Sequence, residues 1–118
     1  MYNDPIVIDL SYLYSITSGD KEFEKILLSG TLDEVDKKVC GLKESWSTTD
    51  AKGVRNHAHS LITLSAIAGM PQVEQWSRKI DNAFADDKFH PEFIIFANNI
   101  FFGWPDAFTE LKIILAAS

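Results

Sequence analysis

The sequence predicts an all-α protein: an antiparallel up-down-up-down four-helix bundle with a short N-terminal capping helix. Five segments carry apolar residues at spacings of three and four, and no segment shows the sustained alternation of a strand. The connections between the long segments are short, which makes neighbouring helices antiparallel. The 118 residues suffice for one domain and not comfortably for two, so we expect a single domain over residues 1–118.

The first two predicted helices cover residues 9–18 and about 20–46. Asp9 is a candidate N-cap of the first helix, which ends at Gly19. Gly30, followed by a capping-box pattern, leaves a break and restart as the alternative to a continuous second helix. The residues expected to face the core are Leu10, Leu13 and Tyr14 in the first helix and Phe23, Leu27, Leu28, Leu32, Val35, Val39 and Leu42 in the second.

The next two predicted helices form a hairpin. Asp50 can cap a helix over residues 51–68, which Gly69 stops, and Pro71 fits the first turn of a helix that reaches about Phe84. Only two or three residues separate the two helices, so they must be antiparallel. Their core-facing residues are Val54, Ala58, Leu61, Ser65 and Ala68 in the one, and Val73, Trp76, Ile80 and Phe84 in the other.

The last predicted helix begins near Pro91, and its apolar stripe stays in phase to Leu115. Pro105 lies within it, so we expect a kink or short break at residues 103–105. Its stripe comprises Phe93, Ala97, Ile100, Trp104, Phe108, Leu111 and Leu115, and further apolar residues lie beside it: Ile94, Ile95, Phe101, Phe102, Ile113 and Ile114. Either the first helix and the kink cover this excess, or it forms a homodimer or partner-docking surface.

Charge and cysteine content exclude several classes of protein. Eleven Lys and Arg against seventeen Asp and Glu give a net charge of -6, the wrong sign for binding nucleic acid. The single cysteine, Cys40, excludes an intramolecular disulfide, and we expect it to be a partly buried packing residue. No signal-peptide pattern is visible at residues 1–9, and no apolar run approaches the roughly 20 residues of a membrane span. We therefore expect a cytoplasmic protein that does not contact the membrane.

Two histidines of the third helix point to opposite sides, because residues two apart on a helix are separated by about 200°. His57 and His59 therefore cannot hold a metal together, and neither a metal site nor a cofactor is expected. His57 lies beside the core stripe, where a partly buried, hydrogen-bonded histidine is the expectation.

His59 faces away from the core. The surface around it holds Lys52, Arg55 and Asn56 on one side and Ile62, Thr63 and Ala66 on the other. An exposed imidazole is largely neutral at pH 7 and offers a nitrogen lone pair, and a nearby Arg can neutralise a phosphoryl group. The pattern is compatible with a phosphoryl acceptor; an ordinary surface histidine is the alternative.

The segment Ala58-His59-Ser60-Leu61, followed by Ser65, Ala66 and Gly69, resembles a motif of the histidine phosphotransfer (HPt) domain family. That family has the pattern A-H-x-L-K-G, a glycine, and then L-x-x-x-C-x-x-L-E, to which Val73, Ser77, Ile80 and Asp81 correspond. Ile8-Asp9-Leu10 and Gly19-Asp20-Lys21-Glu22-Phe23 resemble the starts of the family's first two helices. The resemblance spans residues 8–115.

The resemblance implies that His59 carries a phosphoryl group between receiver domains of response regulators, in a phosphorelay fed by a hybrid sensor histidine kinase. Such a domain has no kinase activity of its own, and the receiver supplies Mg²⁺ and the acidic pocket. Arg55 is then expected to bind the phosphoryl oxygens, and Asp81 to hydrogen-bond the second ring nitrogen of His59.

Two positions depart from the family pattern. The Lys three residues after the histidine is Ile62, and the Gly four residues after it is Thr63. Arg55 and Lys52 are candidates to replace the missing charge. The alternative function is a non-transferring HPt-like module that docks a receiver or kinase domain without chemistry.

Overall fold

The structure, a computed structural model, describes residues 5–117 and confirms the predicted fold class. Its elements are α1 (Ser11–Thr17), α2 (Lys21–Ser47), α3 (Ala51–Ile67), α4 (Pro71–Ala83) and α5 (Ile94–Ala117), with two 3₁₀ turns, η1 (Phe84–Asp86) and η2 (Pro91–Phe93), between the last two helices. Residues 1–4, on which part of the signal-peptide argument rests, lie outside the described residues. Across residues 5–117, no helix combines the length and apolar character needed to cross a membrane.

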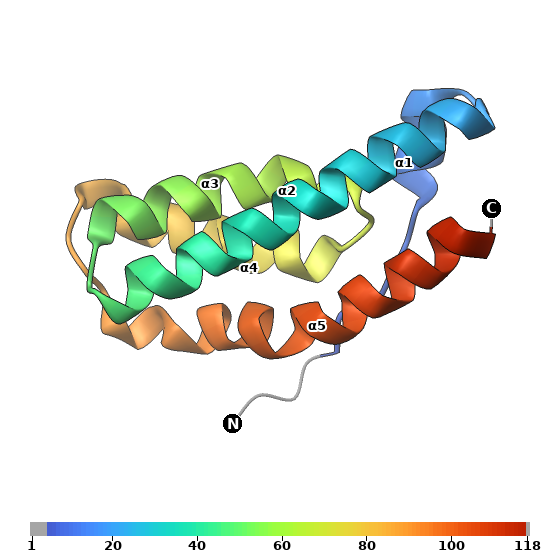
Figure 1. Cartoon of the computed structure of the whole chain (residues 1–118). Coiled ribbons are helices and arrows are strands. Elements are labelled where there is room, and N and C mark those ends of the chain that lie inside the picture. Colours follow the sequence, from blue (N-terminus) through green and yellow to red (C-terminus); the bar gives the residue numbers. More distant parts are fainter. Residues whose placement is uncertain (1–4, 118) are drawn as a thin grey trace.

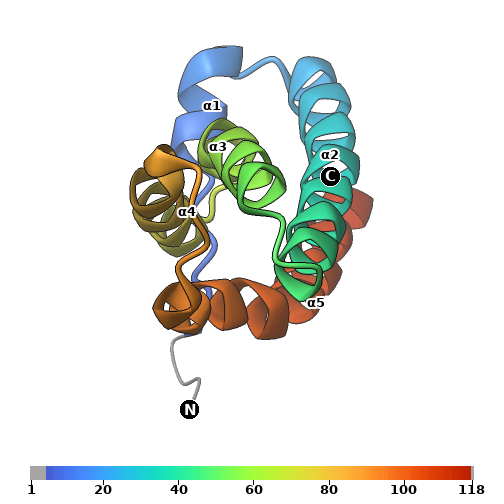
Figure 2. The ribbon, with the colours of Figure 1, turned by 90° about the vertical axis from the view of Figure 1, so that its left-hand side faces the viewer.

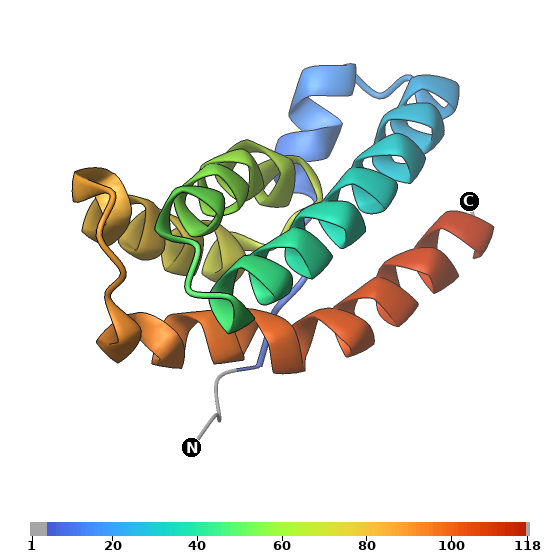
Figure 3. The same cartoon turned by 60° about the vertical axis from the view of Figure 1, so that its left-hand side comes forward.

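The four long helices form an antiparallel bundle (Figure 1). In the closed order α2, α3, α4, α5, each helix packs on its two neighbours, and Figure 2 shows them around a common centre. The short helix α1 packs on α2 and α3 and lies across one end of the bundle (Figure 3). The chain before α1 is held to the α3–α4 turn, where the Asp9 amide donates to the Gly69 carbonyl at 2.8 Å.

The capping residues of the sequence correctly predict where α2, α3 and α4 begin. Asp20 accepts a hydrogen bond from the amide of Phe23, Asp50 accepts one from that of Gly53, and Pro71 is the first residue of α4. The start of α1 is an exception. Asp9 accepts from the amide of Ser11 at 3.0 Å, but the helix itself begins at Ser11, with Leu10 as its N-cap.

The residues of α3 and α4 that were predicted to face the core are all buried. In α1 and α2, by contrast, the predicted burial is wrong at three positions. Tyr14 and Phe23 are exposed. Phe23 lies in the first turns of α2, which extend past the ends of α3 and α4 (Figure 1), and Tyr14 lies on the short helix α1 at the same end of the bundle. Cys40 is also exposed rather than partly buried. It follows the buried Val39, and the turn of about 100° per residue carries its side chain to the solvent side.

The helices α2 and α5 are both continuous, although each contains a residue that favours a break in a helix. α2 is continuous across Gly30, so the break and restart there is wrong. α5 is continuous across Pro105, so the expected break is absent, although the helix changes direction along its length (Figure 1). The indole nitrogen of Trp104 donates to the Asp36 carboxylate at 2.9 Å, which ties this part of α5 to α2.

The apolar excess of α5 is only partly covered. Ile94, Phe101 and Ile114 are half-buried against the core, whereas Ile95, Phe102 and Ile113 are exposed. Packing against the rest of the fold therefore accounts for half of these additional apolar residues. A homodimer through this helix stays a prediction.

Gly69, in the turn between α3 and α4, is a position where we expect an alanine to be costly. Its φ is +76°, and a Cβ would lie 2.5 Å from the Asp9 carbonyl oxygen. Gly69→Ala is expected to lower the free energy of unfolding by about 1–3 kcal/mol, measured by urea denaturation. Gly30→Ala is the matched control: no atom lies within 4 Å of its Cβ, so it should raise stability by about 0.5–1 kcal/mol. Equal effects of the two substitutions would contradict this prediction.

Candidate functional site

The α3–α4 hairpin brings His59 and Asp81 together. Gly69 reverses the chain with a left-handed backbone, and Pro71 starts α4 two residues later. The two helices then run antiparallel, and Nδ1 of His59 lies 3.1 Å from Oδ2 of Asp81. The structure thus contains the hydrogen bond that the resemblance led us to expect.

This hydrogen bond determines which ring nitrogen is available. A carboxylate can only accept a hydrogen bond, so Nδ1 of His59 carries the proton and Nε2 of the neutral ring keeps its lone pair. The His59 side chain is 75% exposed, whereas that of Asp81 is 21% exposed. In the neutral ring, the arrangement therefore leaves Nε2 as the nitrogen with a lone pair, on a largely exposed side chain, as a nucleophile requires.

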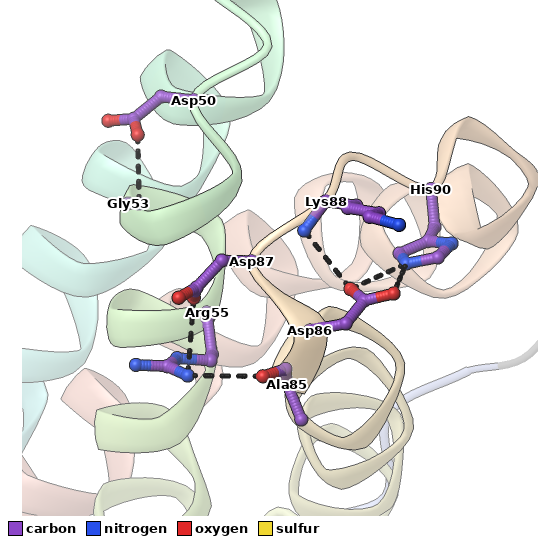
Figure 4. Close-up of polar contacts among 8 residues, drawn as sticks. All are labelled: Asp50, Gly53, Arg55, Ala85, Asp86, Asp87, Lys88 and His90. Atoms are coloured by element: carbon purple, nitrogen blue, oxygen red, sulfur yellow. Dashed lines mark hydrogen bonds and ion pairs between the residues drawn. The ribbon is translucent and has the colours of Figure 1, made fainter.

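Arg55 is held on the connection between α4 and α5. Its guanidinium donates to the Ala85 carbonyl at 3.4 Å and lies 3.2 Å from the Asp87 carboxylate (Figure 4). Although Arg55 lies one helical turn before His59, its charge is therefore paired with Asp87 and not directed toward His59. Of the further candidates on this side, Lys52 is exposed and Asn56 is exposed as well.

Beyond His59 along α3 lies a groove of about 530 Å³, which we call the α3–α4 groove; His59 and Asp81 themselves do not line it. Ile62, Thr63 and Ala66 line it together, as predicted neighbours on one helix face. Its remaining lining comes from Asp9, Ser11, Tyr12, Gly69, Met70, Pro71, Glu74 and Arg78. Lys52, Arg55 and Asn56 do not line it.

Sequence reasoning missed Glu74 and Arg78. They form an ion pair on α4, with Nη2 of Arg78 2.9 Å from Oε2 of Glu74. Arg78 precedes Asp81 by three residues, so helical spacing from Asp81 was the signal that could have found it.

The fold of the chain has a counterpart among solved structures, whereas no family model and no curated protein matches the sequence. The counterpart is the HPT domain from a Hpt sensor hybrid histidine kinase from Shewanella, with a TM-score of 0.75 at 14% identity, covering 94% of this chain and 95% of that one. The chain has the HPt fold. At this identity the likeness concerns the fold alone.

The second histidine of α3, His57, lies on the side of that helix that faces α2. His57 is half-buried against Gly41 of α2, where a Cβ would collide with the imidazole ring. Its partial burial was predicted, but Nδ1 has no hydrogen-bond partner within the described part of the chain, so the expected hydrogen bond is missing at this atom. Burial lowers the pKa of His57, Lys38 lowers it further, and Asp50 and Glu44 oppose the shift.

We expect His57 to make stability depend on pH. Because burial lowers its pKa in the folded state, the unfolded chain binds more protons below pH 6.5, the ordinary histidine pKa. The free energy of unfolding should therefore fall as the pH drops from 6.5 to the folded-state pKa. Urea denaturation between pH 8 and 5 should show a weaker fall for His57→Leu than for the wild type. An identical fall in both proteins would contradict the prediction.

The loop between α4 and α5 holds the third histidine. Nε2 of His90 lies 2.9 Å from Oδ1 of Asp86 (Figure 4), and this hydrogen bond is the main cause of a lowered pKa of Asp86. His90 is the N-cap residue of η2 and directly precedes Pro91. Within residues 5–117, no cluster of three or more His, Cys, Asp or Glu side chains is arranged to hold a metal ion.

Proposed function

We propose that the protein is a histidine phosphocarrier of a phosphorelay, in which His59 accepts a phosphoryl group from one receiver domain and passes it to another. The observation that carries the proposal is the exposed His59 imidazole whose Nδ1 is hydrogen-bonded to Asp81, on an HPt fold. The partners proposed are receiver domains and a hybrid sensor histidine kinase, and the compartment is the cytoplasm. The solved structure that shares the fold is a domain of such a kinase.

The transfer step follows from the ring geometry. The Nε2 lone pair of His59 attacks the phosphorus of an aspartyl phosphate; the N–P bond forms while the P–O bond breaks, and the aspartate leaves as a carboxylate. The Nδ1 proton stays on the ring, and the Asp81 carboxylate stabilises the positive charge that develops there. Onward transfer reverses these steps on a second receiver. The receiver contributes the Mg²⁺ and acidic pocket, so this chain needs no kinase activity of its own.

The surface around His59 suits the close approach of a second protein. Ile62, Thr63 and Ala66 offer small and apolar contacts along the α3–α4 groove. On the other side, Lys52 and Asn56 are exposed, whereas the charge of Arg55 is paired with the Asp87 carboxylate and the Asp81 carboxylate contacts His59. Lys52 therefore contributes a positive group that suits docking at an acidic receiver pocket.

A second candidate function is a docking module without transfer, which Ile62 and Thr63 favour because they replace a Lys and a Gly of the family pattern. Mixing the protein with phosphorylated receiver domains distinguishes the two functions. A carrier acquires acid-labile phosphate and returns it to unphosphorylated receiver. Stable binding to the receivers with no phosphate on the protein would replace the carrier by the docking module.

A further inference from the structure

A phosphoryl group on His59 carries about −1.5 to −2 charges, and α3 provides little to balance them. Ile62 stands where the resembled family has a Lys. Arg55 is paired with Asp87 and Ala85. Lys52 lies seven residues before His59, about 10.5 Å along the helix axis. A cation close to the phosphoryl group must therefore come from another element.

The register of the hairpin places such a cation on α4. His59 faces Asp81, and Arg55 contacts Ala85, four residues earlier on α3 and four later on the chain that continues α4. In this antiparallel pair, three residues forward on α3 correspond to three residues back on α4. Arg78 therefore lies across from Ile62, and both residues line the α3–α4 groove.

The Arg78 side chain is free to exchange its partner. It is 58% exposed, and its Nε and Nη2 both contact a single oxygen of Glu74, at 3.3 and 2.9 Å. A solvent-exposed ion pair of this kind contributes only about 0–1 kcal/mol, so a doubly charged phosphoryl group can compete with Glu74. Arg55, in contrast, is only 36% exposed and has acceptors from two residues.

We propose that Arg78 binds the phosphoryl oxygens of phosphorylated His59 and supplies from α4 the positive charge that the resembled family places at position 62 of α3. This inference rests on the proposed function, because it concerns the phosphorylated form. Arg78 leaves Glu74 when His59 is phosphorylated and returns to it when the group is transferred.

The test uses protein phosphorylated chemically with phosphoramidate, so that no receiver is needed. The phosphorus NMR signal that is absent from His59→Gln reports the group on His59. A nearby cation favours the doubly charged phosphoryl form, so Arg78→Ala should raise the midpoint of its titration by several tenths of a pH unit. Arg78→Ala combined with Ile62→Lys should restore the wild-type midpoint, and Glu74→Gln should lower it.

Arg55→Ala is the matched control, because it removes the same charge on the other side of His59 and should move the midpoint less. A wild-type midpoint in Arg78→Ala, or a larger shift in Arg55→Ala, would overturn the assignment of Arg78. The proposed function is tested separately by transfer from receivers. If Arg78→Ala shifts the titration midpoint but no receiver phosphorylates the protein, the inference on Arg78 is supported and the carrier function is contradicted.

Discussion

His59→Gln is expected to abolish phosphoryl labelling of the protein by phosphorylated receiver domains, a loss limited only by the detection of the assay. The glutamine side chain keeps polarity and similar length but has no nucleophilic nitrogen, since its amide lone pair is delocalised. The His59 side chain is 75% exposed, so the substitution should leave the circular dichroism spectrum and the urea midpoint nearly unchanged.

The other two histidines provide the controls for this experiment. His57 lies on the α2 side of the bundle, and His90 is bonded to Asp86 in the loop before α5. His57→Gln and His90→Gln, when folded, should therefore be labelled as fast as the wild type. Label that persists on His59→Gln would show that another group accepts the phosphoryl group.

Asp81→Leu is expected to slow phosphoryl transfer by about 10²-fold, because the ring of His59 loses both its orientation and the charge opposite Nδ1. Asp81→Asn should fall between this variant and the wild type, since the amide oxygen can still accept from Nδ1 but carries no charge. Rapid-quench transfer from a saturating phosphorylated receiver measures the three rates. Wild-type speed in the Leu variant, or an Asn variant slower than the Leu variant, would contradict the role of Asp81.

Much of the scaffold around His59 could be predicted from local signals. Asp50 acts through its capping side chain, Gly69 and Pro71 act through their backbone conformations, and together they specify a tight antiparallel hairpin. The spacing of His59 and Asp81 within that hairpin then brings the two side chains into contact. The hairpin is local, which is why one sequence sufficed to predict it, whereas the hydrogen bond between His59 and Asp81 was expected only from the resemblance to the HPt family.

Other contacts between elements could not be predicted from the sequence. The pairing of Arg55 with Asp87 depends on the path of the chain after α4, which no periodicity describes. The position of Arg78 opposite Ile62 depends on the register between two helices. Spacing also predicted that His57 is partly buried, but it carries no information on whether a hydrogen-bond partner reaches Nδ1.

Periodicity likewise fails where a neighbouring element ends. Tyr14 and Phe23 follow the apolar spacing of their helices, yet both are exposed at the end of the bundle where α2 extends past α3 and α4. A stripe identifies the side of a helix that faces the core, whereas the length of that core is set by all the helices together.

The central claim is that Asp81 holds Nδ1 of His59 and thereby leaves Nε2 as the phosphoacceptor. Two-dimensional proton–phosphorus NMR of the protein phosphorylated by a receiver tests it most directly, because the couplings to the ring protons identify the phosphorylated nitrogen. We predict one phosphohistidine, phosphorylated at Nε2 of His59. A phosphorus signal coupled as Nδ1-phosphohistidine, or no phosphohistidine with receivers that phosphorylate an established HPt domain in parallel, would contradict the claim.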